Sequence, residues 1–285
     1  MKVLLRCLAA GCALLLAGCS LTRLGYDHLP ALLRWEAGDY VDFTAQQDRD
    51  FASEIRKVWS WHRRSQLPLY AADLRGLADQ VRAGPLSYEQ VVAFSERVDQ
   101  HWQDLADAAL PGYVKLHVEL DDAQVDEMIG RIRKDVERRV HKRLKLSEAQ
   151  RRDKLVDEME DSLRQWVGRP TAQQRGMVRQ WAEQVQLSTP EQEGQRRTGV
   201  DRYAALLASR GQPGFGQRVR DYVRAPEAGQ EVEAHDRAER ERWLRLLGAL
   251  SATLEPEQRQ HLCRRLLDYA QDFEDLAAED SRDDS

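Results

Sequence analysis

The sequence predicts an all-α protein of about eight to ten amphipathic helices, joined by short loops in antiparallel pairs. Glycine and proline are scarce, at 17 and 9 of 285 residues, although both commonly end helices. Long stretches carry apolar residues at intervals of three and four, the helical period. No comparable stretch alternates with the period of two that a half-buried strand requires.

The first 18 residues predict a lipoprotein signal peptide. Lys2 and Arg6 supply a positive start, and the apolar run 7–17 is interrupted only by Gly11 and is too short to span a bilayer comfortably. The segment LLAGC (15–19) resembles the bacterial lipobox, in which cleavage between Gly18 and Cys19 leaves a lipid-bearing cysteine as the first residue. The alternative is an ordinary signal peptide that contains a cysteine.

The residue after Cys19 is Ser20 rather than aspartate, which resembles the pattern of lipoproteins sent to the outer membrane. We therefore expect a lipid-anchored protein on the periplasmic face of the outer membrane of a Gram-negative bacterium. We expect the covalent lipid on Cys19 to attach the protein to the membrane. Apart from this lipid, no cofactor is expected. No cofactor-binding, metal or catalytic residues are predicted.

The cysteine count predicts no disulfide framework. Cys7 and Cys12 leave with the signal and Cys19 carries lipid, so Cys263 has no intramolecular partner and is expected to be buried and inert. Removal of Lys2 and Arg6 changes the formal charge from −5 to −7, so nucleic acid is not an expected partner.

The chain divides into four parts in this interpretation. Residues 1–18 are the signal peptide, 19–43 the lipidated N-terminus and tether, 44–275 the helical domain, and 276–285 an acidic tail that frays. Within the domain, RGQPGFG (210–216) is the clearest flexible break, and 210–230 is a hinge before a C-terminal helical hairpin.

Four apolar stripes predict the strongest helices. Each has intervals of three and four residues, which place the stripe on one helix face. They run through Val125, Ile129, Ile132, Val136, Val140 and Leu144; Leu155, Met159, Leu163, Trp166 and Val167; Trp243, Leu247, Leu250 and Leu254; and Leu262, Leu266, Tyr269, Phe273 and Leu276.

A five-residue pattern recurs six times: FTAQQ (43–47), LSYEQ (86–90), LDDAQ (120–124), LSEAQ (146–150), PTAQQ (170–174) and LEPEQ (254–258). In the first five, a good N-cap residue is followed three positions later by glutamine, the spacing of a capping box. The last has the poorer cap Glu255, followed by Pro256, which suits a first helical turn. The pattern therefore predicts six helix starts. Gly84 and Gly168, each shortly followed by proline and a new cap, predict helix ends.

No motif for catalysis or metal binding is present. The seven histidines are scattered, and HExxH, GxSxG, CxxC and Walker patterns are all missing. We expect a protein that is not an enzyme.

Two stretches are candidate interaction surfaces. WSWHRRSQLPLY (59–70) predicts an aromatic corner between two helices, and its alternative is a ligand or peptide groove lined by Trp59, Trp61, His62 and Tyr70, with Arg63 and Arg64 contacting anions. RIRKDVERRVHKRLK (131–145) predicts a solvated helix face, and its alternative is docking on anionic lipid through Arg138, Arg139, Lys142 and Arg143.

The chain resembles a family of proteobacterial lipoproteins known only as a domain of unknown function. The resemblance is carried by LAGCS (16–20), LGYDHL (24–29), WEAGDYVDFTAQQ (35–47), WHRRSQLPLY (61–70) and the segment 254–277. It covers nearly all of the mature chain and implies no activity. The repeated hydroxyl-x-x-Gln pattern is also similar to the LTxxQ stretches of periplasmic stress chaperones of the Spy and CpxP type, which are small helical proteins that bind unfolded clients.

The expected function is that of a non-enzymatic scaffold or envelope-maintenance factor acting through an envelope protein partner that the sequence does not identify. The alternative is a membrane-tethered holdase chaperone. A hydrolase of envelope polymers is a remote alternative. An exposed concave apolar surface would favour the chaperone, and a convergent polar pocket would favour the hydrolase.

Overall fold

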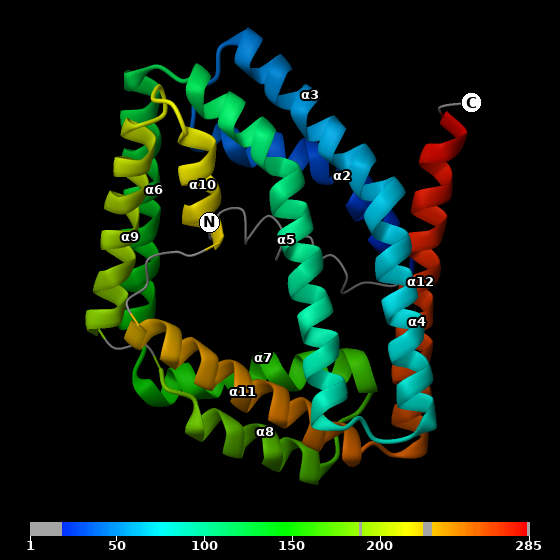
Figure 1. Ribbon diagram of the computed structural model, residues 1–285. Coiled ribbons are helices and arrows are strands. Elements are labelled where there is room, and N and C mark those ends of the chain that lie inside the picture. The colour runs from blue at the N-terminus through cyan, green and yellow to red at the C-terminus, as the bar shows by residue number, and fades with distance from the viewer. Residues whose placement is uncertain (1–18, 188–189, 225–229, 284–285) are drawn as a thin grey trace. The chain divides into compact units, whose positions relative to one another are not determined.

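The computed structural model describes residues 19–187, 190–224 and 230–283, and every regular element within these ranges is a helix (Figure 1). The all-α prediction is confirmed. The predicted signal peptide and Gly18 lie outside the described residues.

The helices form two compact units, and each unit is assembled from three separate stretches of the chain. Unit 1 comprises Met1–Trp61, Gln103–Leu146 and Ser188–Glu227; unit 2 comprises His62–Trp102, Ser147–Leu187 and Ala228–Ser285. Helix α5 (Tyr88–Glu119) gives its first half to unit 2 and its second half to unit 1. The sequence predicted one helical domain over 44–275 and did not anticipate this division.

Unit 1 is built on the second half of α5 and five further helices: α2 (Cys19–Gly38), α3 (Ala45–Trp61), α6 (Asp122–Leu144), α9 (Pro190–Ala208) and α10 (Phe215–Arg224). Helices α6 and α9 run side by side (Figure 1). Their apolar stripes meet in a core that includes Met128, Leu207 and Val219. The predicted stripe from Val125 faces this core through Val136, as a one-sided stripe should, whereas its last residue, Leu144, is exposed.

Unit 2 contains the first half of α5 and a run of helices on either side of it: the π-helix η1 (His62–Gln66), α4 (Leu67–Ala83), α7 (Glu148–Val167), α8 (Ala172–Gln184), α11 (Gln230–Ala252) and α12 (Pro256–Asp283). Helix α4 packs along α12 (Figure 1). Arg75 makes a two-bond contact with Glu274 across this pair, with N–O distances of 2.8 and 2.6 Å. Cys263 is buried there, and its Sγ donates to the Ala78 carbonyl at 3.4 Å, which confirms the predicted burial.

The predicted acidic tail is wrong at its first residue. Leu276 is completely buried, and α12 continues to Asp283. The acidic composition after Glu274 suggested fraying, yet the stripe through Leu266, Tyr269 and Phe273 extends one step further, and burial of Leu276 holds the last turns. Residues 284–285 lie outside the described part of the chain.

The predicted flexible break at 210–216 is a compact turn between α9 and α10. Arg218 fixes it, because its guanidinium donates to Ser209 Oγ at 3.0 Å, to the Ser209 carbonyl at 3.0 Å and to the Pro213 carbonyl at 2.9 Å. Gly214 supplies the positive φ of 79° that the turn needs. Of the remainder of the predicted hinge, 225–229 lies outside the described residues, and the predicted C-terminal hairpin is the pair α11 and α12.

The stretch predicted as a tether, 19–43, is mostly helical. Helix α2 occupies Cys19–Gly38 and packs against α3, where the rings of Tyr26 and Trp59 lie 4.1 Å apart. Arg34 adds an ion pair to Asp48 at 2.7 Å. The predicted lipid attachment residue is thus the first residue of a helix that belongs to unit 1.

The predicted helix starts are confirmed. All five capping boxes form: Thr44 with Gln47, Ser87 with Gln90, Asp121 with Gln124, Ser147 with Gln150, and Thr171 with Gln174. In the sixth pattern, Gln258 Oε1 accepts from the Glu255 amide at 3.1 Å. Gly84 and Gly168 follow the last residues of α4 and α7, as predicted.

Candidate functional site

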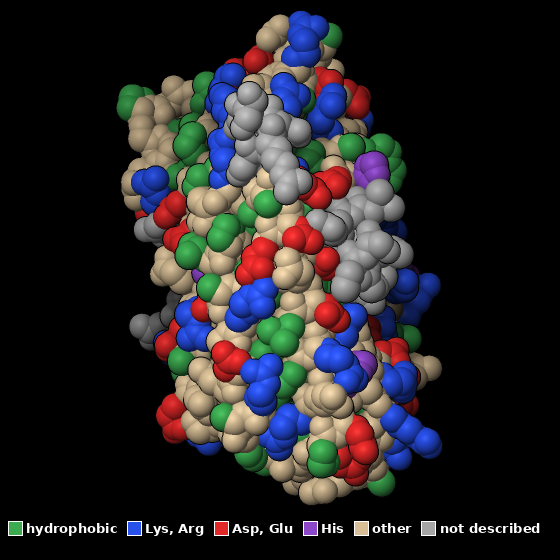
Figure 2. All heavy atoms as spheres, turned by 90° about the vertical axis from the view of Figure 1, so that its right-hand side faces the viewer, with side chains coloured by type: hydrophobic (Ala, Val, Ile, Leu, Met, Phe, Trp, Pro, Cys, Tyr) green, Lys and Arg blue, Asp and Glu red, His purple; other side chains and the backbone are tan. Residues whose placement is uncertain are grey.

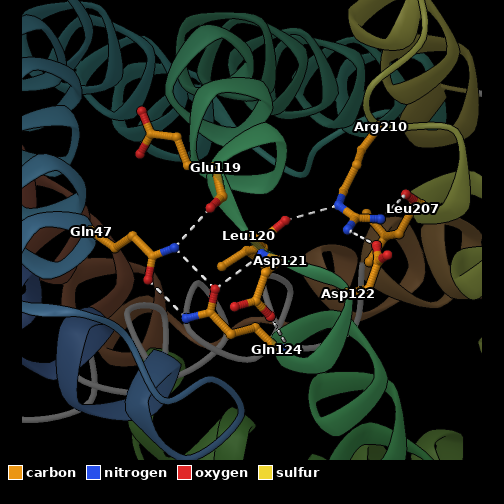
Figure 3. Close-up of polar contacts among 8 residues, drawn as sticks. All are labelled: Gln47, Glu119, Leu120, Asp121, Asp122, Gln124, Leu207 and Arg210. Atoms are coloured by element: carbon orange, nitrogen blue, oxygen red, sulfur yellow. Dashed lines mark hydrogen bonds and ion pairs between the residues drawn. The ribbon is translucent and has the colours of Figure 1, made fainter.

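Two of the recurrent glutamines interlock in unit 1. Gln47 lies in the first turn of α3 and Gln124 in the first turn of α6, and their side-chain amides face each other (Figure 3). Gln47 Nε2 donates to Gln124 Oε1 at 3.0 Å, and Gln124 Nε2 donates back to Gln47 Oε1 at 2.8 Å. Each amide also donates to the carbonyl two residues before the other's N-cap, at Glu119 and Asp42. Two helix starts that are distant in the sequence are thereby fixed to each other.

Unit 2 repeats this arrangement with Gln174 and Gln258. Their amides exchange hydrogen bonds of 2.8 and 3.0 Å. Gln174 donates to the Thr253 carbonyl at 3.2 Å and Gln258 to the Arg169 carbonyl at 2.8 Å. These carbonyls again lie two residues before the partner's cap. The two units therefore lock a pair of helix starts by the same set of contacts.

These pairs use every hydrogen-bonding position of the amides. In each glutamine, Oε1 accepts from its own cap amide and from the partner, and Nε2 donates to the partner and to a carbonyl. A glutamate fits a capping box but has no N–H to donate, which explains why these positions carry glutamine. Among the described residues, Gln90 and Gln150 hydrogen-bond only within their own capping boxes.

Arg210 strengthens the same region of unit 1 (Figure 3). Its guanidinium donates to the Leu120 carbonyl at 3.1 Å, where the chain turns from α5 to α6, and to the Leu207 carbonyl at 3.2 Å near the end of α9. It also pairs with Asp122 in the first turn of α6. A cation at carbonyls near helix ends is favourable, and this one joins α9 to the interlocked helix starts.

A second polar cluster is buried in unit 1. Tyr113 Oη lies 2.6 Å from Tyr203 Oη, and Tyr203 Oη lies 3.1 Å from His117 Nε2. His117 Nδ1 lies 2.8 Å from the Tyr113 carbonyl, which can only accept, so Nδ1 carries the proton. Nε2 must then accept from Tyr203, and Tyr203 accepts from Tyr113. The directions of all three bonds follow from a neutral His117.

Burial governs the ionisation of this cluster. It lowers the pKa of His117 to about 4, and the nearby Arg210 lowers that pKa further, while the bond to the Tyr113 carbonyl opposes the shift. Burial also raises the pKa of Tyr203 to about 12 and that of Tyr113 well above its ordinary value. The cluster is therefore uncharged near neutral pH and contributes to packing as a closed hydrogen-bond chain.

The residues of the predicted aromatic corner are divided between the units. Trp59 and Trp61 belong to unit 1, where Trp59 contacts Tyr26, and His62 to Tyr70 belong to unit 2. No loop separates the two predicted helices, since α3 is followed directly by η1 and then α4. Arg63 lies 3.8 Å from Glu279 in unit 2, and Arg64 is exposed.

His62 belongs to an aromatic cluster within unit 2. Its ring lies 5.3 Å from that of Tyr70, which in turn lies 4.5 Å from His101 and 6.1 Å from Phe273. Burial, with a smaller contribution from His101, lowers the pKa of His62 to about 4. His101 Nε2 lies 2.7 Å from Asp73. These side chains pack helices of unit 2 together.

Helix α6, which contains most of the basic stretch 131–145, forms several ion pairs within unit 1. Arg138 and Arg139 both pair with Asp135, which is buried and also accepts from Tyr40 at 3.4 Å. On the same helix, Arg131 pairs with Glu127 and Asp42, and Arg133 with Asp201. Lys142 is exposed and Arg143 half-buried. Part of the predicted anion-docking charge is thus engaged within unit 1.

One face of the molecule is mixed in charge. Figure 2 shows one face of the molecule, on which acidic, basic and apolar side chains are intermingled. A depression of about 360 Å³ lies at the start of α12 in unit 2, lined by Arg82, Arg259, Arg264, Cys263 and Leu267 among others. Two of its arginines have partners, since Arg82 pairs with Asp79 and Arg259 donates to the Val81 carbonyl at 3.1 Å.

Within the described ranges, no helix is long and apolar enough to cross a membrane. The same residues contain no group of three or more His, Cys, Asp or Glu side chains that could hold a metal ion.

Comparison with known families adds one finding. A model described as Family of unknown function (DUF6279) matches residues 39–234. The chain belongs to this family. The DUF6279 match includes Gln47, Gln124 and Gln174, whereas α2 and Gln258 lie outside it. No curated protein and no solved structure matches the chain.

Sequence reasoning missed the glutamine pairing and the tyrosine–histidine chain. A signal for the first existed, because the third helical position carries glutamine in all six patterns although glutamate serves a capping box equally well. A signal for the second was the four-residue spacing of Tyr113 and His117, which places both on one helix face. Neither signal identifies the distant partner.

Proposed function

We propose that this member of the DUF6279 family is a non-enzymatic lipoprotein, anchored through Cys19 at the periplasmic face of the outer membrane, that acts as a scaffold or envelope-maintenance factor. The observation that carries the proposal is the position of Cys19. The lipobox cysteine is the first residue of α2, and α2 packs on α3. A lipid on this residue would hold the folded unit 1 at the bilayer without a flexible linker.

The burial of the candidate polar side chains supports a non-enzymatic role. Four of the six recurrent glutamines are used to lock helix starts together, and His62 and His117 are buried with lowered pKa values. Groups so enclosed contribute to a stable shape. The exposed side chains then remain for contact with an envelope protein partner.

Two measurements test this proposal. The first is intact mass of the protein extracted from membranes with detergent: an N-terminal peptide that begins at Cys19 and carries added acyl mass is expected, and the same peptide without lipid would refute the anchor. The second is complementation of a deletion strain, scored by envelope permeability. Wild type should restore the barrier, and Cys19→Ser should fail despite equal protein levels.

The holdase alternative predicts a different result. A chaperone should suppress aggregation of a denatured client at near-stoichiometric ratio, and a scaffold should not. Suppression by the wild type, lost when exposed apolar residues such as Leu69 and Val98 are changed to glutamine, would replace the scaffold proposal with the chaperone.

A further inference from the structure

Helix α2 has an inner face that is held by unit 1. Leu29 is buried, the Tyr26 ring lies 4.1 Å from Trp59, and Arg34 pairs with Asp48. The hydrogen bonds from Arg34 Nε and Nη2 to the two carboxylate oxygens of Asp48 measure 3.3 and 2.7 Å. The helix therefore has a fixed rotation about its axis, and what it presents outward is fixed as well.

The opposite side of the helix exposes two large apolar side chains. Leu32 is 45% exposed and Trp35 69% exposed, the highest value among the exposed large hydrophobic residues. They are three residues apart and so share a face, which we call the outer face, and His28 precedes them in the same register. In the sequence, leucines at 21 and 24 continue this spacing toward Cys19.

We propose that the outer face, Leu32 with Trp35, rests in the surface of the bilayer that receives the lipid of Cys19. This inference depends on the proposed lipid anchor. Trp35 lies sixteen positions after Cys19 on the helix, which corresponds to about 24 Å at 1.5 Å per residue. Helix α2 would then lie along the membrane, with acyl chains at its first residue and an indole ring near its last turn.

The chemistry of the outer face suits a lipid surface. Tryptophan has an apolar body and a polar N–H, and it concentrates at the boundary between hydrocarbon and water. Arg34 is directed to the inner face, where it is paired with Asp48. Asp39 is exposed just beyond the end of α2 and sets the limit of the face.

A bilayer is favoured over a second protein copy because the anchor and the face belong to one helix. Once Cys19 is inserted, the lipid surface lies beside α2 at a very high effective concentration, whereas a second copy must arrive by diffusion. Two side chains are a weak anchor by themselves, so their contribution is orientation. The outer face would decide which side of unit 1 is turned to the membrane.

The test uses full-length lipidated protein in phosphatidylcholine vesicles. In a Cys263→Ser background, an environment-sensitive fluorophore is attached to Leu32→Cys, and separately to Val118→Cys, which is about equally exposed on α5 in unit 1. The label at position 32 should shift its emission to the blue on reconstitution. It should lose fluorescence to lipids spin-labelled near the headgroup, and it should resist a water-soluble quencher. The label at 118 should show the reverse.

Flotation separates failure of the docking from failure of the anchor. If the protein does not float with vesicles, the lipid anchor is refuted and the docking with it. If it floats but the label at 32 is quenched only from water, the docking is refuted while the anchor stands. A blue shift that grows with protein density and is insensitive to spin-labelled lipid would assign the face to a second copy. Changing Trp35 to Gln should restore quenching from water at position 32 without affecting flotation.

Discussion

The side-chain amides of Gln174 and Gln258 donate to each other at 2.8 and 3.0 Å, and each also completes the start of its own helix. Both residues are buried, at 0% and 5% exposure. Every donor and acceptor is used, so the contact is stable only while both side chains are amides. This chemistry makes a conservative substitution at Gln174 severe.

Gln174→Glu and Gln150→Glu are a matched pair of substitutions. Both residues occupy the third position of a capping box. At Gln150, which is exposed, a carboxylate still accepts from Ser147 and favours the helix start, so the stability should change by less than about 0.5 kcal/mol. At Gln174 the buried carboxylate has neither of the two N–H donors of the amide, and it faces the side-chain oxygen of Gln258. We expect the free energy of unfolding to fall by about 3 kcal/mol or more. Urea unfolding followed by circular dichroism gives both values, and equal effects would contradict the interlock.

The pH dependence of stability should report on His117. Its pKa is about 4 in the folded protein and 6.5 ordinarily, so below pH 6.5 the unfolded chain binds the proton more readily. The stabilisation due to its neutral form is complete above pH 6.5 and is lost as the pH falls toward 4, by on the order of 3 kcal/mol.

The measurement for His117 is urea unfolding at several pH values between 7 and 4. His117→Gln should reduce the slope in this window. His62 has a similarly lowered pKa and contributes equally to both proteins. Identical slopes for wild type and His117→Gln would show that His117 is not the group responsible.

Gly112 tests the close approach of α5 and α3 in unit 1. A Cβ added there would lie 2.9 Å from Glu54 Cβ, so that one of the two helices must shift. Gly112→Ala should therefore destabilise the protein by about 1–3 kcal/mol. Gly130, inside α6, has no atom within 4 Å of such a Cβ, so Gly130→Ala should stabilise by up to about 1 kcal/mol. Thermal unfolding decides, and a gain in stability at Gly112 would contradict the close packing.

Arg139 and Lys142 distinguish internal ion pairing from lipid docking on the basic helix. Arg139→Gln removes a partner of buried Asp135 and should cost about 1–3 kcal/mol, while Lys142→Gln should be close to neutral for stability. Docking on anionic lipid is therefore best tested with Lys142→Gln in a vesicle flotation assay that compares anionic with neutral lipid. Equal stability of the two variants would mean that Asp135 does not depend on Arg139.

The parts of this structure that could be predicted from sequence are the local ones. The helix start at Ser147 and the helix end at Gly168 depend on contacts within a few residues, and both were predicted correctly. The pairing of Gln47 with Gln124 depends on how two helices pack, which no local pattern encodes. Leu276 was predicted wrongly for a different reason. It belongs to a correctly predicted apolar stripe, yet the acidic composition of the residues around it led to the prediction of a frayed tail.

Each unit is assembled from separate stretches of the chain. The order of synthesis, from the N-terminus onward, therefore determines when each unit can finish folding. Gln47 and Gln124 both precede the middle of the chain, so the first interlock can form early. Gln174 must wait for Gln258, near the C-terminus, and until then its side-chain amide has only the contact within its own capping box. Helix α12 is thus the closing piece of unit 2. A chain that ends before Pro256 would retain every segment of unit 1, yet it would leave unit 2 open at its glutamine lock and along the whole length of α4.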